Sequence, residues 1–187
     1  MKIVKINVKC VGTKAIMFDK FVSMDSKNVV AVEDKFYYDA DKNFVIPAIN
    51  IMSFLSADLT ESATKRTLGR KWKSAAKAAL SFIEITPELI PITNAKDEKL
   101  NLANSGWYTH LAVAKVKKTG GLIVPVAKQR PVIPVGWQVE FSMTLIENDD
   151  LSIKTLQNIF EMGGVTVGFG TYRGVYGKFV IDKWEIE

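Results

Sequence analysis

The segment from Gly163 to Phe179 combines glycines, aromatic rings and positive charge in a way that suits contact with a nucleic-acid strand. Ordering glycine costs backbone entropy, so six glycines in one run indicate positive φ angles or a close approach of the backbone to a partner. Aromatic faces stack on bases, and basic side chains contact phosphates. A glycine-kinked turn between a helix and a strand is the alternative. The candidate contacts are Arg173, Lys178, Tyr172, Tyr176, Gly168, Gly170, Gly174 and Gly177.

The order of the elements around this run excludes a nucleotide-binding glycine loop. Such a loop follows a strand and opens a helix, whose N-terminal amides then face the phosphate. Here the glycines follow a predicted helix and lead into the β-type segment from Lys178 to Trp184. Gly168 and Gly170 therefore do not indicate a dinucleotide site.

A second group of candidate contacts lies on a helix expected from about Leu68 to Ala79. Residues three and four apart are neighbours on a helix, so its basic residues gather near one stripe, and its tryptophan could stack on a base. An ordinary solvated basic face is the alternative to phosphate binding. The candidates here are Arg70, Lys71, Trp72, Lys73 and Lys77, and Arg130 adds a further positive charge in a later, extended segment.

The residue types give little support to catalysis or metal binding. With one histidine, His110, and one cysteine, Cys10, the chain lacks a pair of histidines for acid–base work and the usual zinc sets. His110, alone or with Tyr108 and Lys115, would serve a metal-independent RNA endonuclease, but a surface histidine in a hairpin is the simpler interpretation. Asp39 with Asp41 and Asp149 with Asp150 are carboxylate pairs that could hold magnesium, but a turn role for the first and a cap role at 148–150 for the second explain both. We therefore predict a binding protein with no catalytic residue, no metal and no cofactor.

The composition indicates a folded protein with a mild preference for polyanions. The chain has 187 residues, 48% of them hydrophobic, which is enough for one domain with a buried core. Twenty-five Lys and Arg against 20 Asp and Glu give a net charge of +5, which favours polyanion partners without requiring them. The single cysteine and the lack of a signal pattern or long apolar span predict a reducing cytoplasm and no membrane contact.

The elements that must position these residues follow from hydrophobic periodicity. Strands are predicted at 2–11, 81–85, 107–117, 122–126, 137–147 and about 178–187. Helices are predicted after Pro47, at about 68–79 and at 151–162, the last stopped by Gly163 and Gly164. Residues 13–34 keep no period and are expected to form a long loop.

Without its connections the chain gives strand, helix, strand, strand, helix, strand, which is the order of the ferredoxin-like split βαβ fold. We therefore predict an α+β fold with a ferredoxin-like or RRM-like (βαββαβ) core. Residues 1–187 would form a single domain with a long inserted hairpin region at about 87–136. No aromatic strand motif of the RRM type is present, so the fold by itself does not give the function.

Several short motifs spread over most of the chain resemble those of known families. They are Tyr37-Tyr38-Asp39 before Ile46-Pro47-Ala48, Arg130-Pro131 with Trp137, and Gly168-Phe169-Gly170-Thr171-Tyr172-Arg173 with Gly177-Lys178-Phe179. Together they resemble a group of phage and prophage proteins. More distantly they are similar to the RAMP superfamily, whose members form the backbone subunits of CRISPR effector complexes. In the phage group a proline follows the arginine, where this chain has Gly174.

The resemblance implies a ferredoxin-like or RRM-like core, a glycine-rich loop after the second core helix, and insertions that help to grip a single RNA strand. It places the glycines of that loop and Arg173 near a sugar-phosphate backbone. It also implies self-association side by side along the strand. A host CRISPR effector complex is a further implied partner, since a phage-encoded decoy of a CRISPR subunit would have the same fold.

The sequence thus predicts a non-catalytic, sequence-tolerant, single-stranded nucleic-acid-binding protein of RAMP-like type, for RNA or single-stranded DNA. It would grip the backbone with the 163–179 loop and the basic helix, in the cytoplasm, that of a bacterial host if the protein is phage-encoded. The main alternative is a protein-interaction module such as an anti-CRISPR-type decoy. A metal-independent RNA endonuclease is the weaker alternative.

Overall fold

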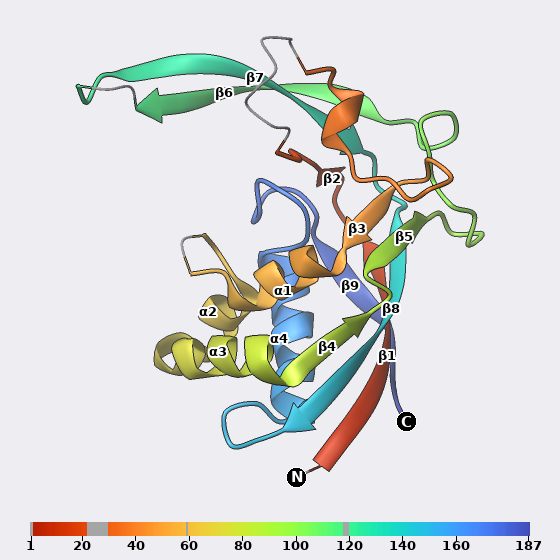
Figure 1. Cartoon of the computed structure of the whole chain (residues 1–187), viewed down its shortest axis with the longest axis vertical. Coiled ribbons are helices and arrows are strands. Elements are labelled where there is room, and N and C mark those ends of the chain that lie inside the picture. Colours follow the sequence, from red (N-terminus) through yellow and green to blue (C-terminus); the bar gives the residue numbers. More distant parts are fainter. Residues whose placement is uncertain (1, 22–29, 59, 118–119) are drawn as a thin grey trace.

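Two antiparallel sheets and a group of helices make up the described part of the chain (Figure 1). The computed structural model describes all residues except 1, 22–29, 59 and 118–119. The strands are β1 Lys2–Gly12, β2 Ile16–Met17, β3 Val45–Pro47, β4 Ile83–Thr86, β5 Leu89–Thr93, β6 Tyr108–Lys117, β7 Ile123–Ile133, β8 Gln138–Glu147 and β9 Phe179–Ile186. The helices are α1 Ala48–Ser56, α2 Ala63–Leu68, α3 Trp72–Phe82 and α4 Ile153–Thr166, with 3-10 turns η1 Glu33–Lys35 and η2 Gly69–Lys71.

The larger sheet has six strands, and β1 lies in it between β8 and β9. Strands β4 and β5 also pair with β8, and β3 pairs with β5. All of these pairs are antiparallel, and the helices lie on one side of the sheet (Figure 1). An antiparallel sheet with helices on one side is compatible with the predicted ferredoxin-like class.

The core forms between the larger sheet and the helices because the apolar residues of β1 and β8 alternate. In β1 the side chains of Val4, Ile6 and Val8 are buried, whereas Lys5 is exposed. The helices meet this layer with aromatic rings: Phe54 of α1 and Phe160 of α4 have centroids 5.3 Å apart. Among the described residues, no helix is long and apolar enough to cross a membrane.

The smaller sheet consists of β2, β7 and β6 and confirms the predicted hairpin. Its long β6–β7 hairpin extends away from the larger sheet (Figure 1). The second arm was predicted at 122–126, but β7 continues to Ile133. Pro131 is accommodated because its carbonyl accepts the N–H of Phe18 at 3.0 Å, and an acceptor is all that proline can offer a sheet.

The prediction that Gly163 and Gly164 stop a helix is wrong, because α4 runs through both to Thr166. Both glycines are required by packing. A Cβ at Gly163 would lie 2.3 Å from the Cβ of Ala63 in α2, and one at Gly164 would lie 2.7 Å from the carbonyl oxygen of Phe179 in β9. The two glycines therefore let α4 approach α2 and β9 closely.

Other predicted boundaries also move. The helix expected at 68–79 is divided at Gly69, whose φ of +53° interrupts the helical backbone, so the basic residues are shared between η2 and α3. The loop expected at 13–34 contains β2, and its residues 22–29 lie outside the described part of the chain. Strand β5, within the predicted 87–136 insertion, belongs to the larger sheet.

The two aspartate pairs differ in role. Asp39 forms the expected turn, since its Oδ1 accepts the N–H groups of Asp41 and Asn43 at 3.0 and 2.8 Å. The predicted cap at 148–150 is displaced: the Oγ of Ser152 instead caps α4 by accepting the N–H of Thr155 at 3.2 Å.

Gly163→Ala tests the packing of α4. By helix propensity alone the change would stabilise the protein by about 1 kcal/mol. Because its Cβ would overlap Ala63 and Phe54, we expect instead that the free energy of unfolding falls by about 1–3 kcal/mol in chemical denaturation. Val165→Ala, at an exposed position of the same helix, is the control and should change it by less than about 0.5 kcal/mol. A stabilising Gly163→Ala would contradict this packing.

Candidate nucleic-acid interface

The Gly-rich loop, residues 168–177, is a compact structure bound to β2 and the residues before it. The N–H of Phe169 donates to the carbonyl of Gly177 at 2.9 Å, which joins the two ends of the loop. The N–H of Gly177 donates to Ala15 at 2.7 Å, and that of Thr171 donates to Met17 at 2.9 Å. The loop is therefore held in one conformation before any ligand arrives.

The glycines allow this close packing. Gly168, Gly170 and Gly177 are buried and have φ angles of +82°, +77° and +71°. A Cβ at Gly177 would lie 1.9 Å from the carbonyl oxygen of Phe169, and one at Gly170 would lie 2.5 Å from that of Met17. The close backbone approach that the glycines indicate is therefore made to the protein's own backbone and not to a partner. At Gly174 a Cβ would meet only the carbonyl oxygen of Thr166 at 3.8 Å, so there the φ of +86° is the sole requirement.

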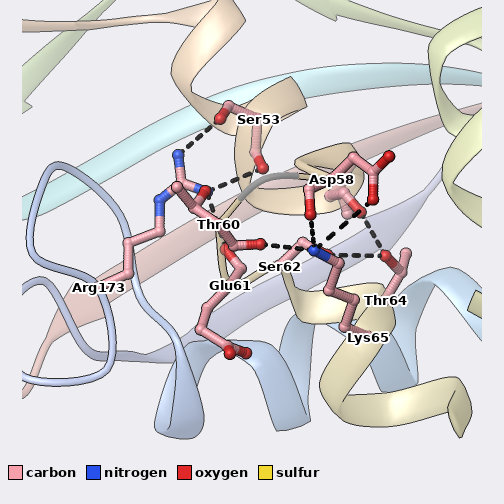
Figure 2. Close-up of polar contacts among 9 residues, drawn as sticks. Ser53, Asp58, Thr60, Glu61, Ser62, Thr64, Lys65 and Arg173 are labelled. Atoms are coloured by element: carbon pink, nitrogen blue, oxygen red, sulfur yellow. Dashed lines mark hydrogen bonds and ion pairs between the residues drawn. The ribbon is translucent and has the colours of Figure 1, made fainter. Parts of the chain in front are cut away.

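Arg173 points inward and anchors the loop to α1 (Figure 2). Its guanidinium donates to the carbonyl and hydroxyl of Ser53 at 2.9 and 2.7 Å, to the carbonyl of Glu61 at 3.2 Å and to that of Gly170 at 3.4 Å. Partial burial lowers the pKa of this guanidinium. The prediction that Arg173 contacts a phosphate is therefore revised: its charge binds carbonyls near the C-terminal end of α1, where a cation is favourable.

A lysine holds the same region from the other side. Figure 2 shows Lys65 donating to the carbonyls of Asp58 and Thr60, the latter at 2.8 Å. The Nζ of Lys65 also lies 4.7 Å from the ring centroid of Trp72, and that of Lys73 lies 5.7 Å from it. The ring of Trp72 is therefore already engaged by two cations, which leaves it a poor platform for a base.

The remaining basic candidates on this side are exposed. Arg70, Lys71, Lys73 and Lys77 lie on η2 and α3 at the surface, and no ion pair to them occurs among the described residues. Lys178 follows the Gly-rich loop and is half-buried. It too has no ion pair among the described residues. These side chains remain available to an anion.

Arg130 has a carboxylate partner. Its Nε lies 2.9 Å from the Oδ2 of Asp19, and the Nζ of Lys35 lies 3.8 Å from the Oδ1 of the same residue. All three side chains are largely buried. Arg130 therefore ties the base of the β6–β7 hairpin to the segment after β2, and the motif that contains it has a structural explanation.

The tyrosines of the loop meet the hairpin, which no sequence pattern predicted. The rings of Tyr172 and Tyr176 have centroids 6.1 Å apart, and the hydroxyl of Tyr176 lies 3.4 Å from the Nδ1 of His110 on β6. Burial is the main cause of a raised pKa for Tyr176. The only histidine in the chain thus lies in an aromatic contact between two segments 66 residues apart.

The open face of the larger sheet is unlike this surface, because its charges compensate one another. Lys5 pairs with Glu187 at 2.8 Å, Lys9 with Asp97 at 2.9 Å, and Lys183 with Glu185 at 3.0 Å. No aromatic ring occurs among the outward side chains of β1 between residues 3 and 11, or among those of β8 between residues 138 and 146. Stacking on the sheet face, the mode of an RRM, therefore has no support here.

The loop lies between the hairpin and the helices (Figure 1). It contacts the hairpin through Tyr176 and α1 through Arg173, so the loop connects these two parts of the molecule. Among the described residues, no three His, Cys, Asp or Glu side chains are grouped to hold a metal ion. The arrangement suits the binding of an extended polyanion that carries flat, apolar groups.

Comparison with known proteins gives a likeness of fold. No family model matches the chain, and no curated protein sequence does. A solved structure that matches is a chain of the cryo-EM structure of the type III-B Cmr-beta bound to cognate target RNA, with a TM-score of 0.54 and 13% sequence identity. The match covers 99% of this chain and 61% of that chain, so this chain spans less than two thirds of its neighbour's length. At this level of identity the likeness is one of fold, and it is compatible with the predicted ferredoxin-like class.

Arg173→Ala tests the anchor. Removing the guanidinium leaves the carbonyls of Ser53 and Glu61 without these donors, so we expect a loss of about 1–3 kcal/mol in the free energy of unfolding. Hydrogen exchange of the Gly170, Thr171 and Gly177 amides should become faster. Lys178→Ala, which removes a neighbouring cation with no recorded side-chain hydrogen bond, should leave both readouts near wild type. Unchanged exchange in Arg173→Ala would show that the loop does not depend on the anchor.

Proposed function

We propose that this protein binds single-stranded nucleic acid, with RNA as its preferred ligand, and that it does so without catalysis. The observation that carries the proposal is the contrast between two faces. The cations of the open sheet face are paired with carboxylates, whereas those of η2 and α3 and Lys178 have no such partner among the described residues. Unpaired cations can bind phosphates, and an exposed ring such as that of Tyr172 can stack on an accessible base.

In this proposal the candidate residues divide into two roles. Arg173, Arg130 and the buried glycines build the surface, as their internal contacts indicate. Contacts to the ligand come from the exposed groups. Phosphates are bound by Arg70, Lys71, Lys73, Lys77 and Lys178. A base stacks on the exposed ring of Tyr172, against which the half-buried Tyr176 packs.

The preference for RNA in this proposal comes from the structural neighbour. We propose that β1, β4, β8 and β9 with the helices form a ferredoxin-like core of RAMP type, since their order in the sheet, β4-β8-β1-β9, allows it. The structural neighbour is described as bound to cognate target RNA.

A protein partner is the second candidate function. The β6–β7 hairpin exposes Leu111, Val113 and Ile123, with 63%, 70% and 60% of their surfaces accessible. Apolar side chains gathered on a projecting hairpin suit contact with another protein. Another copy of the chain along the strand, or a host CRISPR effector complex, would provide such a partner.

The salt dependence of binding to a labelled single strand tests the main proposal. We expect single-stranded RNA to bind more tightly than single-stranded DNA or duplex in fluorescence anisotropy. The triple variant K71A/K73A/K77A should lower the slope of log K against log salt by about 2, because each phosphate contact contributes about 0.7 on single strands.

The matched control removes the same charge from the paired face. K5A/K9A/K183A changes the net charge equally, and its slope should stay close to wild type. Equal effects of the two triple variants would mean that net charge, not this surface, governs binding. Absence of binding at low salt would reject the proposal in favour of the protein partner.

A further inference from the structure

We propose that four aromatic side chains from the Gly-rich loop and β6 form one base-stacking row, which takes unstacked nucleobases at its two ends. The inference rests on the proposed function and adds the hairpin to the ligand-binding surface. The row consists of Tyr172 and Tyr176 of the loop and His110 and Tyr108 of β6.

The row is continuous across the two segments. The ring centroids of Tyr172 and Tyr176 are 6.1 Å apart at an interplanar angle of 37°, and those of Tyr176 and His110 are 5.7 Å apart at 60°. Tyr108 lies two residues before His110 on the same strand, so both side chains point to the same face. Burial is the main cause of the raised pKa of Tyr176, and the charge of Tyr108 adds to it.

The ends of the row are open and its middle is not. Tyr172 exposes 56% of its surface and Tyr108 exposes 45%, whereas Tyr176 and His110 are half-buried. The ring separations within the row are those of aromatic pairs already in contact. A base therefore has no room between these rings and stacks on an outer one.

The backbone holds Tyr172 ready for this contact. Its φ of +56° lies in the left-handed region, which a tyrosine rarely adopts. The conformation is maintained because the Tyr172 carbonyl accepts the N–H of Tyr176 at 3.2 Å and the preceding Thr171 donates to Met17 at 2.9 Å. Strain of this kind marks binding sites, and a ring fixed in advance loses little entropy on binding.

The ligand is defined by this geometry as a strand with unpaired bases. Stacking accepts any base, because each has a π-face, so the row adds affinity without sequence preference. Bases in a duplex are already stacked and cannot reach the row. Lys178, a candidate for phosphate contact, follows the loop directly in the sequence.

The test compares a single-stranded RNA with one that carries abasic sites and has the same phosphates. We expect the wild type to bind the abasic strand more weakly, by about 5- to 150-fold for each of the two bases that the ends of the row take. Tyr108→Ala and Tyr172→Ala should each weaken binding of the normal strand while leaving the abasic strand unaffected. Tyr108→Phe and Tyr172→Phe keep the ring and should bind as wild type. Circular dichroism and thermal unfolding check that each variant is folded.

Each other outcome overturns part of the inference. Equal wild-type affinity for the two strands would reject stacking while leaving salt-dependent binding in place. An effect of Tyr172→Ala without one of Tyr108→Ala would confine stacking to the loop and reject the row. If the wild type bound neither strand, the proposed function and the row would fail together.

Discussion

The interface depends on the fit of one stretch of backbone against another. Residues 168–177 lie so close to Ile16, Met17 and their own neighbours that a side-chain carbon at Gly168, Gly170 or Gly177 would overlap backbone atoms. This packing fixes the course of the loop and therefore the position of its tyrosines. The anchor at Arg173 and the contact with His110 are possible only because the loop follows this path.

The positively charged residues divide into those that hold the structure together and those that remain available to a ligand. Cations with internal partners, such as Arg173 and Arg130, connect segments that are distant in the sequence. Cations on the open sheet face are neutralised by nearby carboxylates. What remains for a polyanion is the group on η2 and α3, together with Lys178. A net charge of +5 would not have revealed this distribution.

Periodicity was a good guide to the elements and a poor one to the contacts between them. The strands at β1 and β8 and the β6–β7 hairpin were predictable because alternation reflects burial on one face. Strand β5 was not, because prolines concealed it, and the course of α4 through Gly163 depends on Ala63 in another helix. A glycine in the sequence indicates that another group approaches the backbone closely, but it does not indicate whether that group belongs to a ligand or to the chain itself. The inward turn of Arg173 and the meeting of Tyr176 with His110 likewise depend on tertiary structure.

The supports of the Gly-rich loop have a consequence for how the protein is made. They come from residues 15–17, from Asn50 and Ser53, and from Glu61, whereas the loop itself follows more than 100 residues after Glu61. During synthesis these segments leave the ribosome long before their partner exists. The surface is therefore completed only once the loop has been translated, and a nascent chain that ends before the loop cannot present it.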